Sequence, residues 1–255
     1  MSLHRPEPGA EDTRQEQQGD KHDPPDHKTP EQGFVPWPRR LGHHARLRRL
    51  EGQGHGQPQA ADARRLAPLD ALPESDFAVK RLLTDLASDQ DVFYRFTAAD
   101  LSDINAVSDP IVGHFRTAPG ARRSVRFAWS GDTAGQGWGI DDEGMRTYAT
   151  MAGHQPDFFL HSGDTIYADG PMQDEVEKDG EVIWKNTVLT DEKRKVAETL
   201  DEFRGQWKYN MMDEHVLAMN AAVPTFFQWD DHEVVNNWSS SRSLMEDDRY
   251  AEKSV

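Results

Sequence analysis

Short apolar runs alternate with amphipathic stretches along the second half of the chain. The runs are bounded by Gly-Asp or Asp-Asp pairs, as buried strands often are. The expected strands are residues 125–129, 158–160 and 223–229. The intervening apolar periodicity is helical, and helices are expected over residues 143–153, 191–208 and 213–221. This β-α-β-α-β order predicts an α/β fold with a mainly parallel sheet and helices outside it.

A different pattern precedes these runs. Val92, Tyr94 and Phe96 alternate with Phe93 and Arg95, which is typical of a strand with one buried face. A second strand is expected from Ile111 to Phe115, and Ala118-Pro119-Gly120 follows as a linker. Residues 75–119 therefore predict part of a small antiparallel β-domain, with too few strands for a complete sandwich of the fibronectin type III or immunoglobulin-like kind.

Residues 1–74 lack a clear secondary-structure pattern. The first 33 are rich in Glu, Gln, Asp, Pro, Lys and His, a composition typical of disorder because it cannot repay the ordering entropy. Arginines are frequent in residues 39–65. A basic arm for nucleic acid is one interpretation, but aromatic residues for base stacking are missing, so an irregular, solvated segment is favoured. A reading-frame error in this stretch is a further hypothesis.

Composition narrows the function. The net charge of −16 makes nucleic acid and anionic membranes poor partners. The absence of cysteine excludes disulfides, thiolate zinc sites and cysteine nucleophiles. Hydrophobic residues make up 36% of the chain, no run is long enough to span a membrane, and no secretory signal is recognisable. The sequence thus predicts a soluble protein with no membrane span, cytoplasmic by default.

Acids follow the expected strands. Asp132 follows the expected strand at residues 125–129, and Asp231-His232 follows the one at residues 223–229. The middle strand, residues 158–160, leads into a segment that contains Asp164, Tyr167 and Asp169. Ligands bind beyond the carboxyl ends of parallel strands, and clustered carboxylates at such an edge favour hard metal ions. Asp164 is the candidate bridge between two ions. Tyr167 becomes a ligand if a strong Lewis acid such as Fe³⁺ deprotonates it, and His232 is a candidate ligand or proton donor.

Structural roles are possible for several of these residues. Asp132 can simply shape a turn, and Asp230 can cap one. His161 lies inside the expected strand, which favours a hydrogen-bonded core histidine over a ligand. Asn236 can pack in its loop or place its amide near a substrate.

Two long motifs resemble a known family. His161-Ser162-Gly163-Asp164-Thr165-Ile166-Tyr167-Ala168-Asp169-Gly170-Pro171 and Gln228-Trp229-Asp230-Asp231-His232-Glu233-Val234-Val235-Asn236-Asn237-Trp238 resemble the signatures of the alkaline phosphatase D (PhoD-like) family of metallophosphoesterases. Gln136-Gly137-Trp138 matches a third, weaker signature. The resemblance covers residues 124–255. It implies an α/β/β/α sandwich preceded by a small β-domain. It also implies a site with two or more metal ions, typically Fe³⁺ with Ca²⁺, that hydrolyses small phosphate monoesters or diesters.

The resemblance also implies roles. Asp164 would bridge the ions, Tyr167 would bind iron, Asp231 would bind the second metal, and His232 would face the substrate with Asn236 nearby. A metal-activated hydroxide would attack the ester while His232 assists the leaving group. Much of the family has Ser-Cys-Gln where this chain has Ser130-Gly131-Asp132, so Asp132 is expected to substitute as a ligand, and other divalent metals are possible.

Other functions stay open. The family's later Gly-Asp-x-His ligands would lie beyond Val255, which predicts a catalytic domain truncated at its C-terminus. The alternatives are a catalytically incomplete fragment that acts as a metal-binding or interaction module, and a phospholipase D-type diesterase. The family is often exported, although this chain has no recognisable signal, and its oligomeric state is undetermined.

Overall fold

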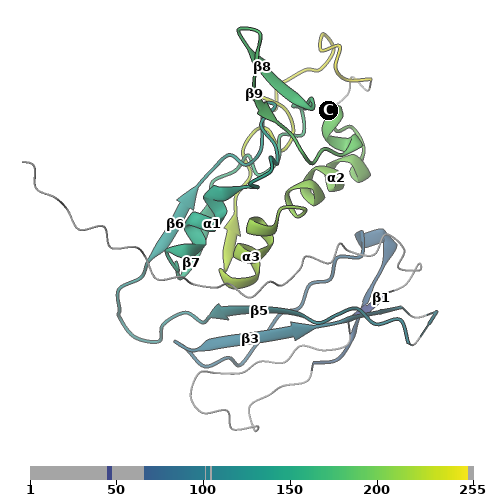
Figure 1. Ribbon diagram of the computed structural model, residues 1–255. Coiled ribbons are helices and arrows are strands. Elements are labelled where there is room, and N and C mark those ends of the chain that lie inside the picture. The colour runs from purple at the N-terminus through teal and green to yellow at the C-terminus, as the bar shows by residue number, and fades with distance from the viewer. Residues whose placement is uncertain (1–44, 48–65, 101, 104, 252–255) are drawn as a thin grey trace, which may run out of the picture. The chain divides into compact units, whose positions relative to one another are not determined.

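The computed structural model describes residues 45–47, 66–100, 102, 103 and 105–251 (Figure 1). The disorder expected for residues 1–33 lies outside the described residues, as does most of the arginine-rich stretch. Two short strands, β1 (Ala45–Leu47) and β2 (Leu69–Ala71), occur within the region expected to be irregular. No described helix is both long and apolar enough to cross a membrane.

The second half of the chain contains a parallel sheet, which confirms the expected α/β fold. Its strands are β6 (Phe127–Ser130), β7 (Phe158–His161) and β10 (Thr225–Phe227). They lie in the order β10-β7-β6, and both pairings are parallel. Each lies within or close to an apolar run expected to be a strand. The second sheet of an α/β/β/α sandwich is absent from the described residues.

Helices cover one face of this sheet (Figure 1). They are α1 (Arg146–Gly153), α2 (Leu200–Asn210) and α3 (Glu214–Ala222). Phe159 of β7 packs with Tyr148 of α1 and with Val216 and Met219 of α3, and all four side chains are buried. This cluster is the core beneath the sheet.

The helix expected over residues 191–208 is two elements. The 3₁₀ helix η2 (Asp191–Arg194) is followed by extended backbone, and α2 begins after Thr199. The Thr199 side chain accepts a hydrogen bond from the Glu202 N–H, and the Glu202 carboxylate accepts one from the Thr199 N–H. This capping box fixes the start of α2. Similarly, the Asp213 carboxylate accepts hydrogen bonds from the His215 and Val216 N–H groups and caps the N-terminus of α3.

The polar insertion after the second strand contains a hairpin. Strands β8 (Glu175–Lys178) and β9 (Glu181–Lys185) pair antiparallel. Asp179 and Gly180 join them with φ of 54° and 82°, the positive values that a two-residue hairpin turn requires. The Asp-Gly pair was the available signal for this hairpin.

The first half of the chain forms antiparallel sheets, as expected. Strands β3 (Asp91–Phe96) and β5 (Ile111–Arg116) pair over their full length. Strands β2, β1 and β4 (Ala98–Asp100) form a second sheet. The short 3₁₀ helix η1 (Pro73–Ser75) follows β2.

The other face of the parallel sheet exposes aromatic side chains. Phe127, Trp129 and Phe226 are 54%, 70% and 59% exposed. The register places Phe127 beside Phe158 and aligns Trp129, Leu160 and Phe226 across the sheet. These five residues form a contiguous apolar face, defined here as the open face. A patch of this kind on a folded chain promotes association.

We expect the double variant Trp129→Thr, Phe226→Thr to lose most of the chain's binding of a hydrophobic fluorescent dye and to associate less. Threonine suits a strand, so the free energy of unfolding should change by no more than about 1 kcal/mol. Dye fluorescence and light scattering measure the effect. Val182→Thr, on the exposed hairpin, is the control. Unchanged dye binding in the double variant would show that the open face is not the apolar surface accessible to the dye.

Candidate metal centre

Three loops meet where the parallel strands end. Ser130, His161 and Phe227 lie side by side in register, so the segments after them leave the same edge of the sheet. The Asp132 N–H donates to the Gly163 carbonyl at 3.1 Å, and the Thr133 N–H donates to the Asp164 carbonyl at 2.8 Å. The first two loops are therefore joined by their backbones.

Asp164 occupies the middle of this edge. Its φ is 52°, and Gly163 before it has φ +105°. A Cβ at residue 163 would lie 2.6 Å from the Asp230 nitrogen, so only glycine allows the second and third loops to approach this closely. The buried Asp164 carboxylate accepts a hydrogen bond from the His232 N–H at 3.1 Å. Burial raises the pKa of Asp164, and the nearby Asp231 and Glu233 add to the effect.

Tyr167 lies between two carboxylates. Its hydroxyl donates to Asp132 at 2.5 Å. Burial raises the pKa of the Tyr167 phenol, and interactions with Asp132 and Asp164 raise it further. Tyr167 is 4% exposed, and its ring fills the space where a Cβ of Gly135 would lie. The phenol oxygen is thus held against two acidic groups, an arrangement in which a cation would favour ionisation.

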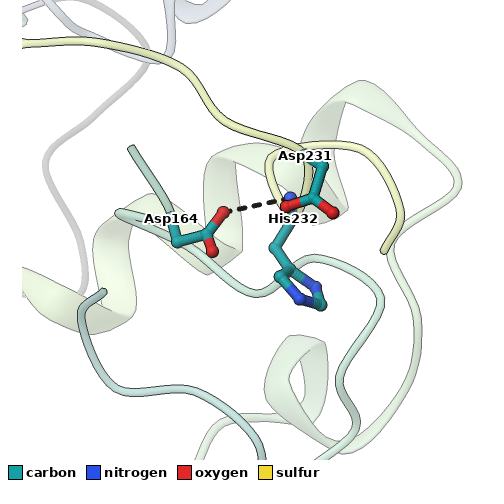
Figure 2. Close-up of side chains that lie close together, drawn as sticks. All are labelled: Asp164, Asp231 and His232. Atoms are coloured by element: carbon teal, nitrogen blue, oxygen red, sulfur yellow. Dashed lines mark hydrogen bonds between the residues drawn. The ribbon is translucent and has the colours of Figure 1, made fainter. Parts of the chain in front are cut away.

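Donor atoms of Asp164, Asp231 and His232 all lie within 4.8 Å of one another. Figure 2 shows the three side chains gathered around one space, with Asp164 coming from a different loop than Asp231 and His232. Carboxylate oxygens and an imidazole nitrogen suit divalent and trivalent ions. A bound ion would also stabilise the charged form of Asp164, whose pKa is raised by burial and, to a lesser degree, by the nearby acids. The donor set therefore fits a metal ion.

His232 is oriented by Asp169. The His232 Nδ1 lies 2.7 Å from Oδ1 of the buried Asp169 carboxylate. The other carboxylate oxygen accepts from the Asn236 N–H at 2.9 Å, and Arg249 donates to the Asp169 carbonyl at 2.7 Å. Burial lowers the pKa of His232, but the hydrogen bond and charge of Asp169, together with the charges of Asp164 and Asp231, outweigh it, so the net shift of the pKa is upward. The Asn236 residue itself is exposed.

His161 is a hydrogen-bonded core histidine, as expected. It is 1% exposed, and its two ring nitrogens lie 2.8 Å from Thr133 Oγ1 and 3.2 Å from Thr165 Oγ1. Burial lowers the pKa of this imidazole. Both nitrogens are engaged in the core, which removes His161 from the candidate ligands.

The structure brings together most of the candidates. Asp164, Asp231 and His232 form the cluster, and Tyr167 connects Asp132 to it through the contacts described above. The sequence placed Asp169 in the cluster of acids expected to suit hard metal ions, where the structure shows it holding His232, and it indicated no role for Glu233. The available signal for Glu233 was an acid placed directly before the apolar pair Val234-Val235.

Two family models match this chain. Residues 127–255 match a model described as PhoD-like phosphatase, and residues 31–119 match one described as PhoD-like phosphatase, N-terminal domain. The second match begins before residue 75, the expected start of the β-domain, and includes the arginine-rich stretch.

Individual relatives agree with these matches. Alkaline phosphatase D of Bacillus subtilis (strain 168) is 36% identical over 95 residues, which are 36% of this chain and 15% of that protein. A solved structure entitled "Structure of PhoD" has a TM-score of 0.54 and 25% identity, and the match covers 77% of this chain and 33% of that one. The chain thus spans a third or less of the length of these relatives.

Proposed function

This chain belongs to the PhoD-like phosphatase family, and from that premise we propose that it forms a metal-dependent site for hydrolysing phosphoric esters. The observation that carries the proposal is the convergence of Asp164, Asp231 and His232 donor atoms within 4.8 Å. The substrate would be a small phosphomonoester or phosphodiester. In this proposal residues 75–119 belong to the small β-domain and residues 124–255 to the phosphatase domain.

Each metal ligand would have a separate role. Asp164 would bridge two ions, because it lies at the middle strand end with acids on both sides. Tyr167, with Asp132 beside it, would bind Fe³⁺, and Asp231 would bind a second ion such as Ca²⁺. When bound, such ions polarise a phosphoryl oxygen and lower the pKa of a bound water molecule.

His232 would act on the leaving group. In the imidazolium form, Nδ1–H would donate to the Asp169 carboxylate and Nε2–H would give its proton to the leaving oxygen, which leaves a neutral ring with its remaining proton at Nδ1. The same hydrogen bond fixes the plane of the ring. Asn236, whose backbone is held by Asp169, would place its amide near the substrate.

A second candidate function uses the same donor cluster. It is a module that binds metal without hydrolysing esters. The two functions share the donor cluster and differ only in turnover.

Metal removal tests the proposal. We expect the purified chain to bind Fe³⁺ or Ca²⁺ and to hydrolyse nitrophenyl phosphate or bis(nitrophenyl) phosphate. A chelator should reduce the rate at least ~100-fold, since the ion supplies several kcal/mol of transition-state stabilisation, and added metal should restore it. Elemental analysis and release of nitrophenol provide the readouts.

The outcomes separate the two candidates. Stoichiometric metal with chelator-sensitive turnover supports the hydrolase. Stoichiometric metal without turnover supports the binding module, and the absence of both contradicts the two proposals. The ratio of monoester to diester rates assigns the substrate class.

A further inference from the structure

Glu233 carries a buried carboxylate that is surrounded by backbone donors. It is 3% exposed. Its Oε1 accepts from the N–H groups of Thr165 at 2.6 Å and Ile166 at 3.2 Å. Its Oε2 accepts from Asp164 at 3.1 Å and Asp230 at 2.8 Å. Burying a carboxylate is costly unless its oxygens are hydrogen-bonded, and four donors occupy about all of its lone-pair positions.

The four donors come from two loops. Three belong to consecutive residues after β7, where the positive φ values of Gly163 and Asp164 help the N–H groups converge into an anion-binding nest. The fourth belongs to Asp230 in the loop after β10. One carboxylate group therefore joins the two loops, together with the hydrogen bond from the Ala168 N–H to the His232 carbonyl at 3.0 Å and the contacts of Asp169 described above.

The metal-ligand candidates lie on both sides of this link. Asp164 is itself one of the donors, and Asp231 and His232 lie between Asp230 and Glu233 in the chain. A shift of either loop would change the separation of the Asp164 carboxylate from the side chains of Asp231 and His232. The His232 N–H bond to Asp164 spans the same two loops.

We propose that Glu233 is a positioning residue that sets the spacing of the metal ligands through the backbone, without touching the ion or the substrate. The inference rests on the proposed metal site. Residues that orient ligands in this indirect way typically change metal affinity 10–100-fold when altered.

The glutamine variant weakens the link with little change in volume. In Glu233→Gln one carboxylate oxygen becomes an amino group, which can only donate. In either orientation that group faces two N–H donors, from Asp164 and Asp230 or from Thr165 and Ile166. Two of the four hydrogen bonds are lost, so the loops should separate more readily.

A matched control exists in α2. The Glu202 carboxylate accepts from the N–H groups of Glu198 and Thr199 at 2.8 and 2.9 Å and lies in the α2 capping box. Glu202→Gln makes the same chemical change outside the ligand loops, at a carboxylate whose Oε2 accepts both backbone N–H groups and whose Oε1 accepts from Lys195 at 2.6 Å. It should lower the thermal midpoint without altering metal affinity.

The experiment measures Ca²⁺ and Mn²⁺ binding by calorimetry and amide hydrogen exchange in the metal-free chain. We expect Glu233→Gln to weaken binding about 10–100-fold and to accelerate exchange at residues 164–166, whereas Glu202→Gln does neither. Glu233→Asp, which keeps the charge but shortens its reach, should show an intermediate affinity and covers the case in which the glutamine variant does not fold.

Two results would overturn the positioning role. One is unchanged ion affinity in Glu233→Gln and Glu233→Asp while the wild-type chain binds the ion. The other is unchanged exchange at residues 164–166 in the glutamine variant. If the wild-type chain binds none of Ca²⁺, Mn²⁺ and Fe³⁺, the proposed function fails, and faster exchange in Glu233→Gln still supports the loop link on its own.

Discussion

Replacing Asp164 with asparagine is expected to abolish tight metal binding and to reduce ester hydrolysis at least ~10³-fold, or about 4 kcal/mol of barrier. Asparagine keeps the volume and an oxygen that can accept from the His232 N–H. It also tolerates the positive φ of 52° at this position. The backbone link between the loops should therefore persist while the charge between Tyr167 and Asp231 is lost.

A matched control separates charge loss from backbone effects. Asp179 in the β8–β9 turn has φ 54° and is exposed. Asp179→Asn makes the same substitution in the same backbone conformation and should leave activity and metal content unchanged. Metal content, nitrophenyl ester hydrolysis and thermal midpoints are measured for both variants. Full activity in Asp164→Asn would remove Asp164 from the proposed site.

The second large effect concerns Lys193, a buried cation. Lys193 is 1% exposed, and its ammonium has no hydrogen-bond partner among the described residues. It lies 5.4 Å from the centre of the Tyr209 ring. Burial lowers the pKa of Lys193 to about 8, with the charge of Asp169 opposing the shift. The folded chain thus binds a proton at this site less tightly than the unfolded chain does.

Stability should increase with pH because of this lysine. Below pH 8 both states are protonated and the full cost of the buried charge is present. Between pH 8 and the ordinary lysine pKa of 10.5, the unfolded state retains more protons, so the free energy of unfolding rises with pH. The shift corresponds to about 3 kcal/mol.

Lys193→Met tests this directly. Methionine has a similar length and no charge, so the variant should be more stable at pH 7 by about 1–3 kcal/mol, and the rise above pH 8 should disappear. Urea unfolding at pH 7, 8, 9 and 10 measures both effects. Lys178→Met, at an exposed position of β8, is the control. Parallel pH profiles for wild type and Lys193→Met would contradict the buried-charge explanation.

Much of the architecture could be predicted because periodicity is a local property of the chain. The runs at Val125, Phe158 and Val223 predicted three strands, and the Gly-Asp and Asp-Asp pairs located the ends of the last two. Their sequence order implied parallel strands, and parallel strands place their carboxyl ends at one edge. Asp132, Asp164 and Asp231 could therefore be selected as candidates before any coordinates.

The sequence pattern was less informative where a helix and an extended segment fit the same residues. The helical spacing of apolar residues over 191–208 predicted one continuous helix, because a few extended residues between η2 and α2 do not disturb that spacing. Only the Thr199–Glu202 capping box shows where the helix begins. The Asp179-Gly180 pair is typical of a hairpin turn, but the polar residues on either side do not alternate with apolar ones, so they did not predict strands.

The sequence by itself determined the α/β class, the family and the acids at the strand ends, because short motifs and apolar spacing encode these features. Only the tertiary structure decided which acids serve which purpose. Asp169 holds His232, and Glu233 holds two loops, although both are acids within the same motifs as the candidate ligands. Those roles depend on hydrogen bonds between residues that are more than 60 positions apart in the sequence. A local sequence pattern cannot predict which of these residues meet in the folded chain.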